Sequence, residues 1–247
     1  MRLPAIGRAP AEYGPAFMET MAQAYLRQTP WTRLRLEVVR ALVEPAAGER
    51  VLDLGCAAGA VSHFLSTFGC ATVGVDAEPL AIETARGLFP RLRFEVADVA
   101  ELPFPDASFD KAVAADLVEH LDDATFERML GEVRRVLVPG GTLSLYTPNP
   151  GHPIELLKAR NLLLARNPTH IGLRTAVELV RALEAASFRV DRNEWRPSFY
   201  PLIRGVERLG GRRLPFLRYR LCLRGRTPEL EVRSGSVAAS RAARRAS

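Results

Sequence analysis

Short apolar segments alternate with amphipathic segments along the chain from residue 50 to residue 146. Their length and β-branched content predict buried strands over residues 50–54, 71–76, 92–98, 110–116 and 142–146. Apolar residues at helical spacing lie between them, as at Val61, Leu65 and Phe68, and Pro79 is suited to the start of the next helix. Strands that alternate with helices predict an α/β fold with a parallel sheet covered on both faces.

The rest of the chain is less regular, but its signals still divide it. Thr175 and Glu178 have the spacing of a capping box, so a helix is expected to begin there. Two further strands are expected at 189–196 and 217–224, with an inserted amphipathic helix at 201–209. With 247 residues, the chain can form one large domain with additions. The expected division is N-terminal helices or a lid at 1–45, a main domain at 46–226 with an insertion near 199–216, and a basic tail at 227–247.

Charge is unevenly distributed, because residues 204–247 carry twelve Arg against three Glu. That segment has a net charge of +9, so the remainder of the chain is at −3 within the total of +6. A basic end can attract nucleic acid, anionic lipid or an acidic partner, but a solvated tail is the simpler expectation. Three cysteines do not form a disulfide framework, and neither a long apolar span nor a signal peptide is evident. A reducing, cytoplasmic location is therefore expected.

A glycine-containing bend follows the first strand, between Asp53 and Gly59. Gly55 allows a sharp turn and the close approach of a ligand, and the next helix offers free N–H groups. The lysine of a phosphate-binding loop is missing, and the glycine spacing differs from that of a dinucleotide fingerprint. Asp76 and Asp98 end the next two strands, so all three acids are expected at the carboxyl edge of the sheet. There they could hold the ribose and the base of a nucleoside.

Five motifs occur in order: residues 51–59 (VLDLGCAAG), 75–76 (VD), 97–98 (AD), 102–110 (LPFPDASFD) and 137–141 (LVPGG). Together they resemble the class I S-adenosylmethionine-dependent methyltransferases, and most closely the branch of quinone-biosynthesis enzymes. The resemblance covers roughly residues 35–190. It implies a seven-stranded Rossmann-like sheet, strand order 3-2-1-4-5-7-6, with one reversed strand. It also implies S-adenosylmethionine as cofactor and S-adenosylhomocysteine as product.

The resemblance further implies which residues contact the cofactor. These are Asp53, Gly55, Cys56, Ala57 and Gly59 around the methionine end, Asp76 and Ala77 at the ribose, Asp98 and Val99 at the adenine, and Asp116 and Leu117 beneath the sulfonium. Ala57 departs from the family, which usually has glycine there. If its φ angle were positive, the strain would cost about 1 kcal/mol.

Methylation of a hydroxyl group needs a base with a pKa near 7, which is usually histidine. His120 follows the fourth strand, and His170 lies in a Thr-His pair that the quinone branch has at the rim of its acceptor pocket. Either could be the base, or His120 could have a structural role; His63 is expected on the surface. If residues 116–120 form a helical turn, Asp116, Glu119 and His120 share one face and could bind Mg²⁺. A metal is nevertheless not expected.

The class of molecule that accepts the methyl group is restricted mainly by motifs that the sequence lacks. The motif of amino-group nucleic-acid methyltransferases is missing after the fourth strand, and no Pro-Cys pair offers a nucleophile for pyrimidine methylation. O-methylation of a small molecule is therefore expected, such as a phenol, quinone precursor, sugar or other natural product. N-methylation, tRNA modification and a cofactor-binding regulatory domain remain alternatives. Residues 201–220 could lie on an anionic membrane, although a packed insertion is the simpler expectation.

Overall fold

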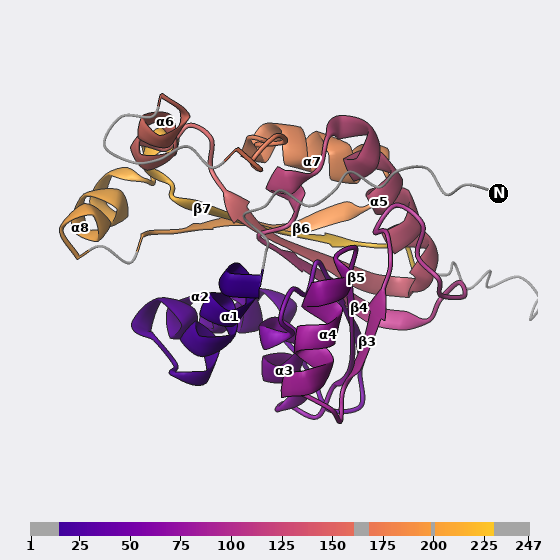
Figure 1. Cartoon of the computed structure of the whole chain (residues 1–247). Helices are drawn as coiled ribbons and strands as arrows, with labels where there is room; N and C mark the ends of the chain where they lie inside the picture. The colour runs from indigo at the N-terminus through magenta and orange to yellow at the C-terminus, as the bar shows by residue number, and fades with distance from the viewer. Residues whose placement is uncertain (1–14, 161–167, 199–200, 230–247) are drawn as a thin grey trace, which may run out of the picture.

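The computed structural model describes residues 15–160, 168–198 and 201–229 and builds them around one twisted sheet (Figure 1). The seven strands run in the order β3-β2-β1-β4-β5-β7-β6, as expected. Their bounds are β1 (Arg50–Leu54), β2 (Ala71–Asp76), β3 (Arg93–Val96), β4 (Phe109–Ala115), β5 (Leu137–Pro148), β6 (Arg189–Arg196) and β7 (Arg220–Arg226). β1 to β5 pair in parallel, and β7 is antiparallel to both β5 and β6, so it is the single reversed strand.

Helices cover both faces of the sheet. Their bounds are α1 (Pro15–Leu26), α2 (Pro30–Val43), α3 (Ala60–Ser66), α4 (Pro79–Leu88), α5 (Asp123–Val136), α6 (Pro153–Ala159), α7 (Ala176–Ala185) and α8 (Pro201–Gly210), with short 3-10 turns at η2 (Val118–His120) and η3 (Pro215–Leu217). Figure 1 shows α3 and α4 below the sheet and α5 and α7 above it. The strand period of two explains this arrangement, because Val51 packs into one apolar cluster and Leu52 into the other.

Local signals set most of the element boundaries. Pro79 is the first residue of α4, and the Thr175 capping box forms with both of its hydrogen bonds. β5 is longer than expected, because Leu137 already pairs with Phe109 before the register shifts between Phe109 and Lys111. Gly140, at a φ of 76°, lies within this irregular first part of the strand. A proline-glycine sequence that predicts a turn is thus part of the first residues of β5, a strand that lies between β4 and β7.

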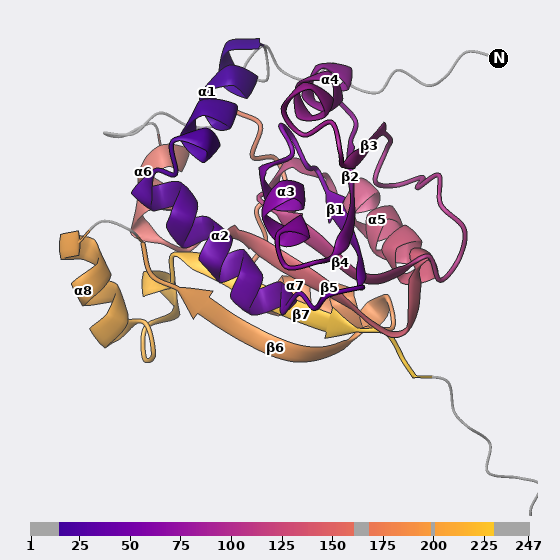
Figure 2. The same ribbon diagram turned by 90° about the horizontal axis from the view of Figure 1, so that it is seen from below.

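The insertion between β6 and β7 contains α8 and η3, close to the expected range. Figure 2 shows α8 at the same end of the molecule as the start of α2. The packed chain extends past the expected start of the tail, since Thr227 is buried and its N–H donates to the Gly141 carbonyl at 2.9 Å. Residues 1–14 and 230–247 of the expected lid and tail lie outside the described residues, as do positions 199–200 of the insertion. In the described ranges, every helix is too short or too polar to cross a membrane.

Candidate functional site

The bend between β1 and α3 is built from residues with left-handed backbone angles. The φ angles are 65° at Gly55, 46° at Ala57 and 79° at Gly59. A Cβ atom on Gly55 would lie 2.7 Å from Leu117 Cδ1, and one on Gly59 would lie 2.8 Å from Phe94 Cζ. Both glycines are therefore required by space as well as by angle. Ala57 does adopt the positive φ at which a side chain costs about 1 kcal/mol.

Asp76, at the end of β2, holds this bend in place. Its Oδ2 accepts a hydrogen bond from the Ala57 N–H at 2.9 Å, and its Oδ1 accepts one from the Glu78 N–H at 3.0 Å. Burial raises the pKa of the carboxyl group. Each carboxylate oxygen has a second acceptor position, so Asp76 can bind the loop and still accept hydrogen bonds from a ligand.

Asp53 lies close to Asp76 but is more deeply buried. Its side chain accepts a hydrogen bond from the Ser62 hydroxyl at 2.6 Å, and only 2% of the residue is exposed. Burial is the main reason that its pKa is raised to about 6, and the charge of Asp76 makes a smaller contribution to this rise. Cys56 is also buried, and its N–H donates to the Val75 carbonyl. Asp53 and Asp76 thus form one acidic region beside the bend.

The expected adenine contacts lie at the end of β3. Asp98 caps its own turn, because its Oδ1 accepts a hydrogen bond from the Ala100 N–H at 2.8 Å. Val99 is 7% exposed and belongs to the apolar core, whereas Ala77 is exposed next to Asp76. Asp98 and Ala77 are therefore accessible for a ligand at this edge, while Val99 offers mainly its backbone.

Asp116, at the tip of β4, is held by two arginines that the sequence did not identify. Its Oδ2 accepts from Arg35 Nε at 2.7 Å and its Oδ1 from Arg220 Nη1 at 2.8 Å. Burial raises the pKa of Asp116, but the guanidinium groups of Arg220 and Arg35 outweigh burial and hold it below its ordinary value. The neighbouring Leu117 packs against Gly55. Leu117 therefore lies at the bend, as expected, while both carboxylate oxygens of Asp116 already have cationic partners.

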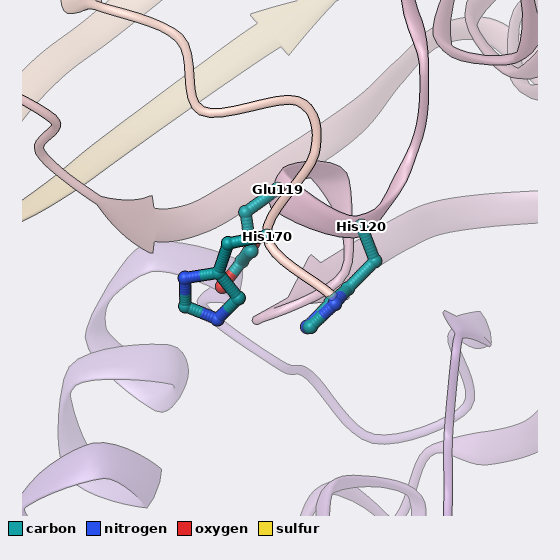
Figure 3. A group of neighbouring side chains, drawn as sticks. All are labelled: Glu119, His120 and His170. Carbon is teal, nitrogen blue, oxygen red and sulfur yellow. The ribbon is translucent and has the colours of Figure 1, made fainter. Parts of the chain in front are cut away.

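Three ionisable side chains, drawn in Figure 3, form a cluster in which Glu119 and His120 are influenced by the charge of Asp116. Glu119 and His120 come from η2, and His170 comes from the segment before α7; their potential ligand atoms lie within 4.8 Å of one another. The two imidazole rings meet edge to face at 5.0 Å. Asp116 is not part of this cluster, because the residue precedes the η2 turn with a φ of 59° and its carboxylate binds two arginines. The predicted trio of Asp116, Glu119 and His120 is therefore replaced by one that contains His170.

Burial keeps all three groups of the cluster uncharged near neutral pH. It raises the pKa of Glu119 to about 8, with a further contribution from Asp116, and the acid also accepts a hydrogen bond from the Thr147 hydroxyl at 2.9 Å. Burial lowers the pKa of His120, and burial together with His120 lowers that of His170 to about 4. His120 Nδ1 lies 3.1 Å from the Thr169 carbonyl oxygen. A carbonyl only accepts, so Nδ1 carries the proton and Nε2 carries the lone pair.

The segment with His170 is fixed to η2 by contacts that sequence reasoning missed. The Gly172 N–H donates to the Glu119 carbonyl at 2.9 Å, and a Cβ atom on Gly172 would lie 1.9 Å from the Leu121 carbonyl oxygen. Arg174 donates to the carbonyl oxygens of Val118 and Leu121 at 2.8 and 3.0 Å. A glycine and an arginine just before a capping box were the only sequence signal, and neither type is diagnostic.

His63 is not the surface residue that the sequence predicts. Its ring stacks on Phe89 at 4.3 Å, and its Nδ1 lies 2.5 Å from the Tyr25 hydroxyl. Burial lowers its pKa. It therefore joins α1 to α3, away from the cluster of Glu119, His120 and His170.

Residues 51–141 match the model of the methyltransferase domain family. A relative in Mycolicibacterium smegmatis, named "Probable S-adenosylmethionine-dependent methyltransferase", is 35% identical over 65% of this chain and 60% of its own length. A fungal relative, the O-methyltransferase resE of Aspergillus sclerotiorum, is 30% identical over 71% of this chain and 66% of its own. This domain belongs to the class I S-adenosylmethionine-dependent methyltransferases. The likeness extends to the fold, since an S-adenosylmethionine-dependent methyltransferase structure from Archaeoglobus fulgidus covers 84% of this chain and is itself covered to 99%, with a TM-score of 0.66 at 18% identity.

The methyltransferase domain thus has S-adenosylmethionine as its cofactor. The bend fits such a group, because Asp76 beside the exposed Ala77 can accept hydrogen bonds in addition to those from the Ala57 and Glu78 N–H groups. The chain spans about 55–60% of the length of the first mycobacterial relatives that it matches. The detail of a quinone-biosynthesis branch stays a prediction.

Proposed function

We propose that this protein transfers a methyl group from S-adenosylmethionine to a hydroxyl group of a small organic molecule. The observation that carries the proposal is the contact between two uncharged imidazoles, His120 in the turn after β4 and His170 in the segment before α7. The cofactor supplies a methyl group on a sulfonium. The fungal relatives named O-methyltransferases favour oxygen over nitrogen as the acceptor atom.

The cofactor contacts proposed for this chain are those that share the bend. Asp76 would accept the ribose hydroxyls, Asp98 and the Val99 backbone would meet the adenine, and residues 55–59 would surround the methionine end. Asp53 lies beside them as a buried acid. Replacing Asp76 with alanine should weaken binding of S-adenosylhomocysteine in calorimetry by about 1–3 kcal/mol, through lost charge-assisted hydrogen bonds. Unchanged affinity would overturn the ribose assignment.

His120 is the better placed of the two bases. The Thr169 carbonyl fixes its tautomer with the lone pair on Nε2, the atom that would take the proton of the acceptor hydroxyl. The pKa of His170, at about 4, makes it a weaker base, so we assign it the role of orienting the acceptor. In the step, the oxygen–methyl bond forms as the sulfur–methyl bond breaks, and the hydroxyl proton moves to His120.

Steady-state kinetics can separate these two roles. His120→Ala should lower kcat by 10²–10⁴-fold, the usual contribution of a general base, and should flatten the acidic limb of the pH profile. His170→Ala should raise KM more than it lowers kcat. Equal losses in kcat with unchanged pH profiles would refute the assignment. Dialysis against a chelator tests the alternative that Glu119, His120 and His170 hold a divalent ion, a donor set better suited to a transition metal than to Mg²⁺.

We infer a second property, contact with an anionic membrane, from the outer face of α8. Ile203, Val206 and Leu209 are 40%, 58% and 87% exposed, and the exposed Arg213 follows on the same segment. An amphipathic helix with these two features binds the interface of anionic lipid. Pelleting with phosphatidylglycerol vesicles should fall when Val206 and Leu209 become serine, and not when the exposed Leu26 of α1 does. Equal pelleting with pure phosphatidylcholine vesicles would contradict the inference.

A further inference from the structure

A cavity of about 460 Å³ lies between α2, β6 and α8. Among the residues that the structure describes, five arginines line it and no acidic residue does: Arg35, Arg196, Arg204, Arg208 and Arg212. This volume is within the range of pockets that bind small organic ligands. A chamber with this lining has a strongly positive potential.

Not all of these arginines have their charge balanced by the protein. Arg35 pairs with Asp116, and Arg196 pairs with Glu194 at 2.8 Å. Within the described part of the chain, Arg204, Arg208 and Arg212 form no ion pair, and the Nε of Arg204 is buried without a hydrogen-bond partner. A buried donor without an acceptor is costly. An anion in the cavity would satisfy it.

The buried acid of α8 does not neutralise the cavity. Glu207 is fully buried, but its Oε1 lies 2.9 Å from His152 Nε2 and its Oε2 accepts a hydrogen bond from the Ser198 N–H. His152 Nδ1 accepts from the Ile154 N–H, so a neutral ring carries its proton on Nε2, which is close to Glu207 Oε1 but makes no hydrogen bond with it. Glu207 is thereby used to fasten α8 to the start of α6, and it is not among the residues that line the cavity.

The other walls of the cavity are aromatic. Trp31 comes from α2, Trp195 from β6, Tyr146 from β5, and Tyr219 from just before β7. The guanidinium of Arg220 lies 5.3 Å from the Tyr146 ring and 5.1 Å from the Tyr219 ring, and the same group holds Asp116. Flat apolar ligands pack well on such rings. Arg35, which lines the cavity, also pairs with Asp116 at the tip of β4.

We propose that this cavity binds the acceptor and that the acceptor is an organic anion, a carboxylate or phosphate ester on an aromatic or other flat apolar body. Naming the ligand as the methyl acceptor rests on the proposed function. The binding of an organic anion in this cavity does not depend on it. Arg204, Arg208 and Arg212 grip the anionic group, since guanidinium groups bind carboxylate and phosphate through paired hydrogen bonds. The rings of Trp31 and Trp195 hold the flat body.

The chain provides its own probe, because its two tryptophans both line the cavity. Tryptophan fluorescence should change on titration with phenyl phosphate, and much less with neutral benzamide or with inorganic phosphate. Changing both Arg204 and Arg208 to glutamine should weaken phenyl phosphate at least tenfold. Arg208→Gln alone, at an exposed position, should weaken it severalfold and guards against misfolding of the double variant.

Arg213→Gln is the matched control, since Arg213 is exposed on the same segment but does not line the cavity. It should leave the affinity for phenyl phosphate within twofold. Equal affinity for benzamide, an unchanged affinity in the double variant, or tighter binding of a uridine dodecamer than of phenyl phosphate would each overturn the proposal. Calorimetry with S-adenosylhomocysteine on the same samples keeps the two proposals apart. If the wild-type protein binds phenyl phosphate but not S-adenosylhomocysteine, the proposed function is refuted. If it binds S-adenosylhomocysteine but not phenyl phosphate, the proposal of an anionic acceptor is refuted.

Discussion

Replacing Asp53 with asparagine should make the cofactor-free protein more stable at neutral pH. Asp53 is 2% exposed, and burial raises its pKa from 3.8 to about 6. Ionising it in the folded state therefore costs about 3 kcal/mol at pH 8, since each pKa unit corresponds to about 1.4 kcal/mol. The variant avoids this cost, but it loses the charged group that accepts a hydrogen bond from the Ser62 hydroxyl, which destabilises it by about 1 to 1.5 kcal/mol. The net stabilisation expected at pH 8 is about 1.5 to 2 kcal/mol.

The pH dependence of this difference identifies its cause. A carboxyl group with a raised folded-state pKa favours the folded state below the unfolded value, and that contribution is lost as the pH rises through the folded value. The wild-type protein should thus lose stability relative to Asp53→Asn between pH 4 and pH 7. For the values of 3.8 and about 6, the advantage of the variant should shrink by about 1.5 kcal/mol from pH 8 to pH 5.

Urea denaturation at several pH values measures both quantities without adding salt. Asp110→Asn is the matched control, because hydrogen bonds from Arg50 lower the pKa of Asp110 and the same substitution should destabilise the protein at pH 8. A difference between Asp53→Asn and wild type that is the same at pH 5 and pH 8 would refute the reasoning. It would mean that packing, and not the buried charge, sets the effect.

Three further predictions concern the bend and the histidine cluster. Gly172→Ala should lower stability by more than about 2 kcal/mol in thermal unfolding, because its Cβ atom would overlap the Leu121 carbonyl; an unchanged melting temperature would show that the segment can shift freely. Glu119→Gln should stay within about 1 kcal/mol of wild type at pH 7 in urea, because a pKa of about 8 leaves the acid mostly protonated and the amide keeps an acceptor for Thr147; a loss of several kcal/mol would show that it is ionised. Ala57→Gly should relieve about 1 kcal/mol of strain in the folded state, offset by a similar gain in unfolded-chain entropy, so thermal unfolding should show little change in stability, and a loss of several kcal/mol would contradict this.

Local sequence patterns predicted most of the fold. The alternation of buried strands and amphipathic helices depends on periods of 2 and 3.6, which a sequence shows directly, so β1, β2, α4 and β6 lie at or within a residue of their expected bounds. The capping box at Thr175 and the proline at position 79 are equally local. The place of Gly55 follows too, since a bend at the end of a strand needs a residue that accepts a positive φ.

The residues on the acceptor side of the site could not be predicted from local pattern in the same way. Arg35, Asp116 and Arg220 are separated by 81 and 104 residues along the chain, and nothing near any of them indicates a partner. The same holds for His170, which meets Glu119 and His120 because Gly172 lets two backbone segments touch.

Periodicity and backbone conformation are properties of neighbouring residues, so the sequence by itself determined the layered sheet, the glycine bend and the acids that end its strands. Charge compensation and burial depend on which distant side chains share a small volume. Only the tertiary structure could therefore decide that Asp116 is neutralised by two arginines, that two histidines are kept uncharged, and that three arginines around an aromatic cavity form no ion pair with any described residue.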